Sequence, residues 1–108
     1  MGKMYELRTY VTEPGRLSVL LDRFRNHTLD LFVRHGMTSI GYWVTTEHPD
    51  TLVYLLAHDD AAAAEASWAA FRSDPEWLQV RADSEKDGPV VQSVTSSFLE
   101  PTDFSALV

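Results

Sequence analysis

The sequence contains no cysteine, which removes disulfide bonds, thiolate metal ligands and cysteine nucleophiles from consideration. Basic side chains are also few: nine Lys and Arg stand against sixteen Asp and Glu, so the formal net charge is −7. An acidic excess of this size argues against a partner that is held through its phosphates, whether a nucleic acid or an anionic membrane. Because nothing in the chain needs oxidation, we expect a reducing compartment and a cytoplasmic protein.

Long apolar runs are missing as well, so the sequence predicts neither a signal peptide nor a membrane-spanning helix. The opening Met1-Gly2 resembles a myristoylation signal, but Glu6 stands where that signal requires Ser or Thr. The chain has 108 residues, of which 44% are hydrophobic and 11% aromatic. This length and composition predict a single folded domain spanning residues 1–108.

Hydrophobic periodicity and turn residues divide the chain into strands and helices. Glycine after a helix and proline at its first position are the usual stop and start signals. The expected elements, in chain order, are a strand at 4–11, a helix from Pro14 to just before Gly36, strands at 38–47 and 51–58, a helix capped by Asp59 or Asp60 and ending near Arg72, a second helical piece starting at Asp74-Pro75, and a strand at 90–99.

This order of elements is βαββαβ and predicts an α+β, ferredoxin-like fold: a four-stranded antiparallel sheet with helices on one face. The strand at 51–58 is apolar on both of its faces, so both must be covered. We therefore expect a homodimer in which two copies pack sheet against sheet around a barrel-like core. The two apolar faces of this strand consist of Leu52, Tyr54 and Leu56 and of Val53, Leu55 and Ala57.

Several separated segments of the chain are characteristic when taken in order: Tyr5-Glu6-Leu7-Arg8-Thr9-Tyr10, Pro14-Gly15, Phe24, Arg34-His35-Gly36-Met37, Gly41-Tyr42-Trp43, Trp68, Phe71 and Asp74-Pro75-Glu76-Trp77. Together these segments closely resemble the NIPSNAP family. The resemblance implies a short bacterial-type member of the dimeric α/β-barrel superfamily, which agrees with the expected dimer. That superfamily also contains antibiotic-biosynthesis monooxygenases, haem-degrading enzymes and isomerases, so the fold leaves the chemistry open.

Three polar side chains alternate along the first strand and therefore share one face: Glu6, Arg8 and Tyr10. We expect this face to look into the barrel between the two copies. Arg8 then suits an anchor for an anionic or carbonyl-bearing ligand, and Glu6 is a candidate general acid or base whose pKa is raised by burial. The alternative is a salt bridge between Glu6 and Arg8 that only holds the strands in register.

Aromatic and histidine side chains complete the candidate site. Tyr42 and Tyr54 are expected on the same face, either with their hydroxyls directed at the cavity or packed as core residues. Trp68 is a candidate for the roof of a ligand pocket; a core or interface residue is the simpler alternative. His58, beside Asp59 at the rim of the cavity, is the third candidate catalytic residue; a surface histidine is the alternative.

The four histidines show no spacing typical of a metal site, and no nucleophile or phosphate-binding motif is present. We therefore predict no metal and no tightly bound cofactor. Most of the acidic surplus, including Asp83, Glu85 and Asp87, is expected to be a solvated coat. Three functions remain: a protein that binds or transforms a small, partly apolar, oxygen-rich molecule in the barrel; a non-catalytic dimeric binding or adaptor module; and, more weakly, a haem-binding monooxygenase-like protein.

Overall fold

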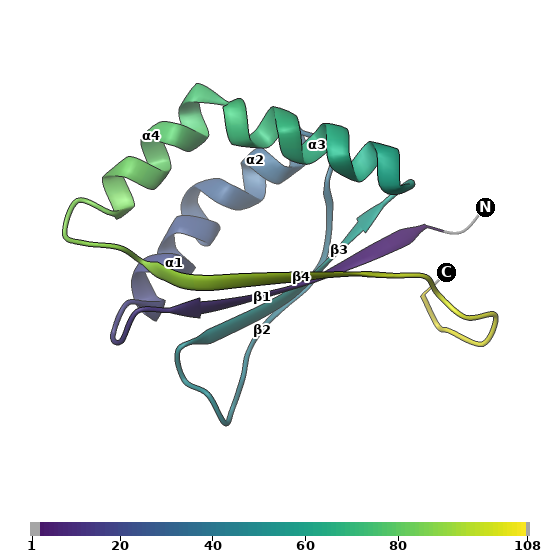
Figure 1. Ribbon diagram of the computed structural model, residues 1–108, viewed down its shortest axis with the longest axis horizontal. Helices are drawn as coiled ribbons and strands as arrows, with labels where there is room; N and C mark the ends of the chain where they lie inside the picture. Colours follow the sequence, from purple (N-terminus) through teal and green to yellow (C-terminus); the bar gives the residue numbers. More distant parts are fainter. Residues whose placement is uncertain (1–2, 108) are drawn as a thin grey trace.

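The computed structural model describes residues 3–107 of the chain. The predicted βαββαβ order is confirmed, with each of the two helical units divided into shorter pieces (Figure 1). The elements are β1 (Met4–Thr12), α1 (Leu17–Arg23), η1 (Phe24–Thr28), α2 (Leu29–Arg34), β2 (Thr38–Val44), β3 (Thr51–His58), α3 (Ala61–Ser73), α4 (Pro75–Ser84) and β4 (Val91–Leu99).

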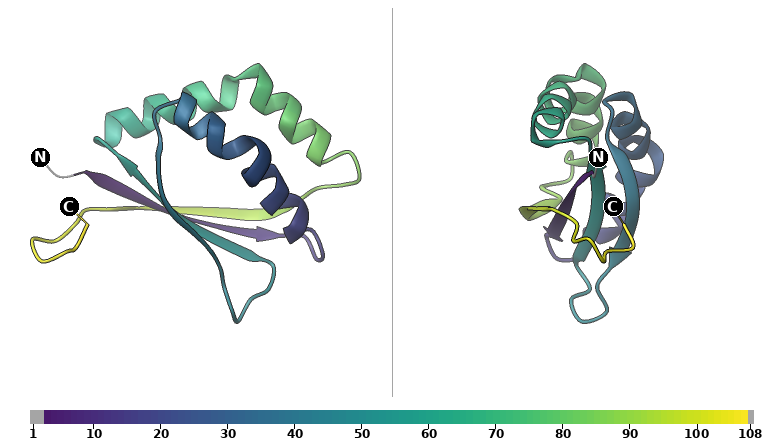
Figure 2. Two further views of the ribbon diagram at one scale, coloured as in Figure 1. Left: turned by 180° about the vertical axis from the view of Figure 1, so that it is seen from behind. Right: turned by 90° about the vertical axis from the view of Figure 1, so that its right-hand side faces the viewer.

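The four strands form one antiparallel sheet in the order β2-β3-β1-β4. Leu7 of β1 pairs with Leu55 of β3 on one side and with Ser97 of β4 on the other. All the helices cover the same face of this sheet, as the two further views show (Figure 2). This is the ferredoxin-like arrangement that the sequence predicts.

The first helical unit differs from the prediction at its start and in its middle. Pro14 lies in a turn rather than at the first helical position, because β1 continues to Thr12 and α1 begins only at Leu17. In the middle, η1 is a π-helical turn, which takes in one more residue than an α-helical turn and shifts the register of the side chains. Arg23 and Phe24, which follow the buried Leu20 by three and four positions, are both buried at the start of this turn.

The ends of the helices follow the predicted capping signals. Gly36 has a φ of +79° and stops the first unit in the left-handed conformation that glycine tolerates. Asp60, one of the two predicted caps, accepts a backbone hydrogen bond at the start of α3, and Asp74 does the same before Pro75 at the start of α4. The second strand is shorter than predicted, because β2 ends at Val44.

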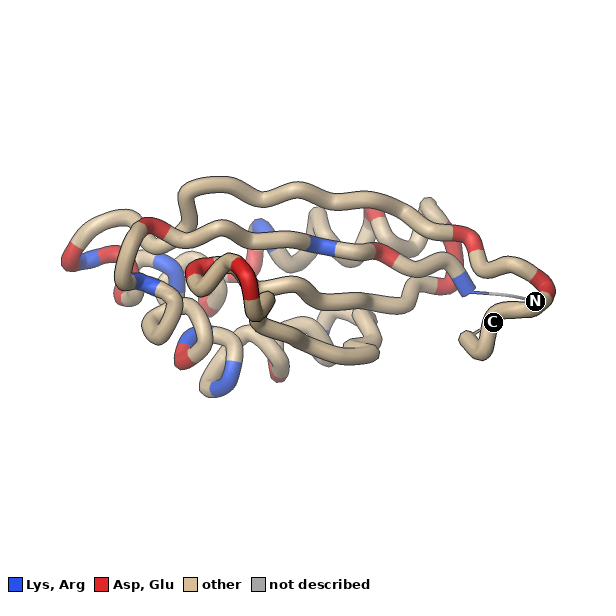
Figure 3. The backbone as a smooth tube through the Cα atoms, turned by 90° about the horizontal axis from the view of Figure 1, so that it is seen from below, with Lys and Arg blue, Asp and Glu red and all other residues tan. Residues whose placement is uncertain are grey.

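The face of the sheet opposite the helices is uncovered and carries no charge. Glu6 and Arg8 are the only Asp, Glu, Lys or Arg residues within the four described strands (Figure 3). Both point toward the helices, because both contact Trp68 of α3. Leu7, Leu55 and Trp43 lie on the uncovered face, where Trp43 is 56% exposed. No helix between residues 3 and 107 is long and apolar enough to cross a membrane.

Candidate functional site

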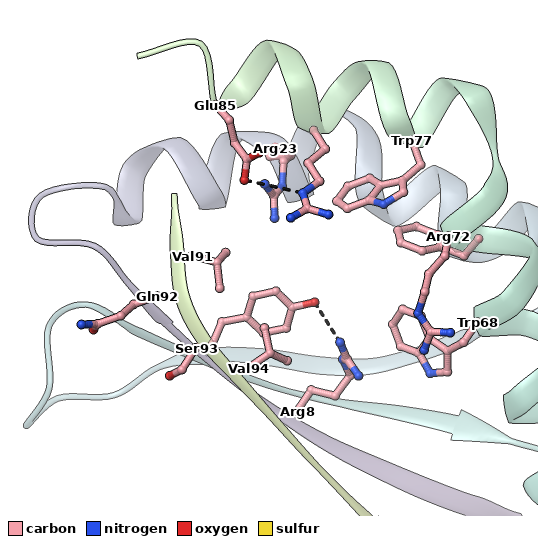
Figure 4. Close-up of a pocket in the computed structure, with 13 residues that line it drawn as sticks. Arg8, Arg23, Trp68, Arg72, Trp77, Glu85, Val91, Gln92, Ser93 and Val94 are labelled. Atoms are coloured by element: carbon pink, nitrogen blue, oxygen red, sulfur yellow. Dashed lines mark hydrogen bonds and ion pairs between the residues drawn. The ribbon is translucent and has the colours of Figure 1, made fainter. Parts of the chain in front are cut away.

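A cavity of about 370 Å³ opens between the sheet and the helices, beside the edge strand β4 (Figure 4). Its walls come from β1, α1, α3, α4 and β4. Residues from both helical units and from the first and last strands therefore meet there. A cavity of this size is at the lower end of the range that binds small molecules.

The polar face of β1 looks into this helix-side region and not at the uncovered face of the sheet. Glu6, Arg8 and Tyr10 share one face as predicted, but Tyr10 packs against Phe24 at 5.8 Å between ring centroids, and Glu6 bonds Trp68. The expectation that this face lines a barrel between two copies is therefore wrong. The physical reason is that side chains of the same chain, on the neighbouring strands and at Trp68 of α3, already bond the buried charges of Glu6 and Arg8.

Glu6 is 1% exposed and lies at the centre of a buried hydrogen-bond network. Its Oε1 accepts from Trp68 Nε1 and His58 Nε2, both at 2.8 Å, and its Oε2 accepts from Arg8 Nη1 at 3.0 Å and Ser96 Oγ at 2.6 Å. Burial by itself raises the pKa of Glu6, but these four donors outweigh it and hold the pKa at about 2. The predicted rise in pKa is therefore wrong, and the salt bridge with Arg8 is present.

His58 also differs from its predicted setting. It is 3% exposed rather than at a rim, and its partner is Glu6, whereas Asp59 pairs with Lys3 at 2.7 Å. Neither Glu6 nor His58 belongs to the described wall of the cavity. The structure therefore brings these two candidate residues together, but it places them behind Arg8.

Arg8 connects the buried network to the cavity. Its Nε donates to Tyr54 Oη at 2.9 Å, its Nη1 to Glu6 at 3.0 Å and its Nη2 to Tyr10 Oη at 3.1 Å, while the guanidinium lies 4.1 Å from the centre of the Trp68 ring. A guanidinium has five N–H groups, so one remains on each Nη. Burial alone lowers the pKa of Arg8, but Tyr54, Tyr10 and Glu6 raise it overall, and the group stays charged.

Tyr42 and Tyr54 lie on this face as predicted, but both pack with the hydrophobic core. Tyr54 is fully buried and donates its hydroxyl hydrogen to Tyr10 Oη at 3.1 Å; burial raises its pKa well above the usual value. Tyr42 stacks on Tyr54 and its hydroxyl lies 2.7 Å from Ser39 Oγ. Of the predicted ligand-binding residues, Arg8, Tyr10 and Trp68 line the cavity, and Tyr42 and Tyr54 do not.

Sequence reasoning missed most of the positive charge at this site. Arg23, Arg72 and Arg81 line the cavity together with Arg8, and Glu85 is the one acidic residue in its described wall. Four of the nine basic side chains of the chain thus meet at the cavity, against one of the sixteen acidic ones. Glu85, expected as part of a solvated coat, instead lies 3.6 Å from Arg81 Nε.

The side chains of the cavity do not fit a haem. Axial ligands of haem are normally His, Cys, Met or Tyr, and the described wall contains none of the first three. Its tyrosine, Tyr10, already accepts hydrogen bonds from Arg8 and Tyr54. Between residues 3 and 107, no group of three or more His, Cys, Asp or Glu residues is placed to hold a metal ion.

Comparison with known proteins identifies relatives in fold. The family model for NIPSNAP matches residues 5–106. A NIPSNAP family protein of unknown function from Agrobacterium tumefaciens is 21% identical, with 99% of this chain and 95% of that chain covered and a TM-score of 0.86. An uncharacterised NIPSNAP-like domain protein from Burkholderia xenovorans is 21% identical, with 95% and 88% covered and a TM-score of 0.83.

A more distant neighbour comes from Bordetella bronchiseptica and is described as a putative antibiotic biosynthesis monooxygenase. It is 14% identical, with 94% of this chain and 99% of that chain covered and a TM-score of 0.72. At these identities the solved structures share the fold with this chain, and no more follows from them. No curated protein matches the sequence.

Proposed function

This chain belongs to the NIPSNAP family, and we propose that it binds a small, partly aromatic anion in the cavity between its sheet and its helices. The observation that supports the proposal is the charge of the wall: four arginines and one glutamate, in a chain whose net charge is −7. A positive cavity with low-dielectric walls concentrates anions, even on an acidic protein. Trp68, Phe71 and Trp77 line the same cavity and favour a ligand with an aromatic or apolar body.

The sheet side of the cavity supplies hydrogen-bond donors for an oxygen of the ligand. Arg8 keeps an N–H on each Nη, and Tyr10 accepts from Arg8 and Tyr54, which leaves its own hydroxyl hydrogen for a ligand. The buried Glu6 network fixes the position of Arg8, so these donors are preorganised. A transformation of the bound molecule would use these donors to stabilise negative charge on its oxygen.

The cleanest test uses the distribution of the three tryptophans. Trp68 and Trp77 line the cavity, whereas Trp43 lies on the opposite face of the sheet, so the fluorescence of a Trp43→Phe variant comes from the cavity alone. This variant is titrated with benzoate, phenylacetate and 3-phenylpropanoate, and with the corresponding neutral amides. We expect the carboxylates to change the fluorescence saturably and to bind at least about tenfold more tightly than the amides.

Two results would count against anion binding. The first is the absence of any saturable fluorescence change with all three carboxylates. The second is equal affinity for each acid and its amide, because the cationic wall then contributes nothing to recognition.

We also propose that the uncovered face of the sheet packs against the same face of a second copy. That face has no charged side chain in the described strands and carries Leu7, Leu55 and Trp43, which is the composition of a buried sheet face. A self-complementary patch of this kind forms a two-fold dimer. The ligand cavity then belongs to each subunit, on the far side of its own sheet.

Analytical ultracentrifugation at micromolar concentration tests the dimer. We expect about twice the chain mass of 12.2 kDa for the native protein and the single-chain mass for Leu55→Lys. Val33→Lys is the matched control, because Val33 is exposed on α2, on the helix side of the molecule, and its replacement leaves the mass unchanged. A native protein that sediments as a 12.2 kDa species contradicts the proposal.

A further inference from the structure

We infer that the ligand is a carboxylic acid whose carboxylate binds to Arg23, on the helix side of the cavity, with its ring beside Trp77. The inference rests on the proposed function and names the ligand class and its anchor. Figure 4 shows Arg23 and Trp77 along the helix side of the cavity and Arg8 on the sheet side, so the anchor is separate from the donors of the Glu6 network.

Arg23 is a buried cation without a counterion. It is 6% exposed, its Nη1 donates to the neutral Ser84 Oγ at 3.2 Å, and its Nε has no hydrogen-bond partner in the described part of the chain. No described carboxylate lies within ion-pairing distance of it, although eight such pairs exist elsewhere. A buried charge that lacks a partner is unfavourable, so an anion in the cavity would stabilise it.

Each of the other three arginines of the cavity is either paired with a carboxylate or exposed to solvent. Arg8 pairs with Glu6 at 3.0 Å, Arg81 lies 3.6 Å from Glu85, and Arg72 is an exposed residue over the Trp68 ring. Outside the cavity, Arg16 also has an unpartnered Nε, but its Nη2 donates to the carbonyl oxygens of Ser84 and Gly88. Arg23 is therefore the cavity cation with the strongest need for a ligand anion.

One nitrogen of Arg23 remains available to a carboxylate. Nη1 is engaged by Ser84 and Nε is itself buried, which leaves Nη2 as the nitrogen that a ligand in the cavity can reach. Its N–H groups can donate to a carboxylate oxygen in a charge-assisted hydrogen bond. The guanidinium lies 5.0 Å from the centre of the Trp77 ring, so an aromatic group joined to that carboxylate lies against the indole.

Two neighbouring charges bear on Arg23. Burial lowers the pKa of Arg23; Glu85 opposes this effect and Arg81 adds to it. Glu85 thus supplies negative charge near Arg23, but its carboxylate lies 3.6 Å from Arg81 Nε. A ligand carboxylate at Arg23 meets repulsion from Glu85, so removing the charge of Glu85 strengthens carboxylate binding.

The experiment compares two arginines of the same helical segment in the Trp43→Phe background. Arg23→Met removes the proposed anchor, and Arg25→Met is the matched control, because Arg25 is exposed and pairs with Asp22 at 2.7 Å. Benzoate is expected to bind about ten- to a hundredfold more weakly to the Arg23→Met protein, with benzamide changed by less than about threefold. Arg25→Met leaves benzoate binding unchanged, and Glu85→Gln strengthens it.

A melting curve of the ligand-free Arg23→Met protein separates binding from folding. Its melting temperature is expected to equal or exceed that of the parent, because methionine removes an uncompensated buried charge. A clear fall in melting temperature shows that Arg23 is structural and overturns the inference. Benzoate binding that survives Arg23→Met but is lost in Arg81→Met overturns it too and leaves the proposed cavity intact. If the parent binds none of benzoate, phenylacetate and 3-phenylpropanoate, both proposals are removed.

Discussion

Replacing Glu6 with Gln preserves the shape of the side chain and removes the charge that four donors share. The amide of Gln places an NH₂ donor where Glu6 has an acceptor oxygen, so the donors that bonded that oxygen then face another donor. Arg8 also loses its buried carboxylate partner. Breaking a buried ion pair on one side costs about 3–5 kcal/mol, because the remaining charge stays buried. The variant therefore tests whether the network holds the fold together.

The pKa of Glu6 gives a second, independent figure for what its charge contributes to stability. It falls from the ordinary value of 4.5 to about 2, which corresponds to roughly 3 kcal/mol of stability at neutral pH. Because the folded-state pKa lies below the unfolded one, this stability is present above about pH 4.5 and is lost as the pH falls toward 2. The Glu6→Gln protein should have a free energy of unfolding about 3 kcal/mol lower than the parent at pH 7, and this free energy should change less between about pH 4.5 and pH 2.

Urea unfolding followed by tryptophan fluorescence at pH 7, 4 and 3 measures both effects. Glu65→Gln is the matched control, because Glu65 is an exposed carboxylate on α3. A Glu6→Gln protein within about 0.5 kcal/mol of the parent at pH 7, with an unchanged pH dependence, would refute the reasoning.

Three further changes test the surroundings of the site by the same unfolding assay. Trp68→Phe keeps a ring beside Arg8 but removes the N–H donor to Glu6, so it should lower the free energy of unfolding by about 1.5–3 kcal/mol. It should also raise the pKa of Glu6, which an NMR titration of the Glu6 carboxyl carbon measures. Asp74→Asn should weaken the loss of stability in acid, because His35, the backbone of Glu76 and Arg34 hold the pKa of Asp74 at about 2; an unchanged acid profile contradicts this. Gly36→Ala should cost about 1–2 kcal/mol, since φ there is +79°, and a neutral result would mean that the helix end relaxes.

The fold was largely predictable because local signals agree with the tertiary structure. Gly36 and the Asp74-Pro75 pair end and start helices where expected, and the strand boundaries of β3 follow the apolar run at 51–58. The predicted helix start at Pro14 was wrong, because proline is also common in turns and the pairing of β1 extends to Thr12.

The site was predictable only where strand alternation decides it. Alternation places Glu6, Arg8 and Tyr10 on one face, but it gives no information on which side of the sheet the helices lie. Arg23 follows the buried Leu20 by three positions, which places it on the buried side of α1, but an arginine at such a position gives no sign in the sequence that it is buried rather than solvated. Glu85, in an acidic stretch after α4, has no sequence feature that distinguishes a cavity residue from a solvated one.

A crystal structure of the protein with 4-bromobenzoate tests the central claim, anion binding in the cationic cavity, most directly. The anomalous signal of bromine locates the ring, and the density locates the carboxylate. The account predicts bromine inside the cavity lined by Trp68 and Trp77, with a carboxylate oxygen within hydrogen-bond distance of the Arg23 guanidinium. Bromine on the uncovered face of the sheet, or a cavity without bromine, would contradict it.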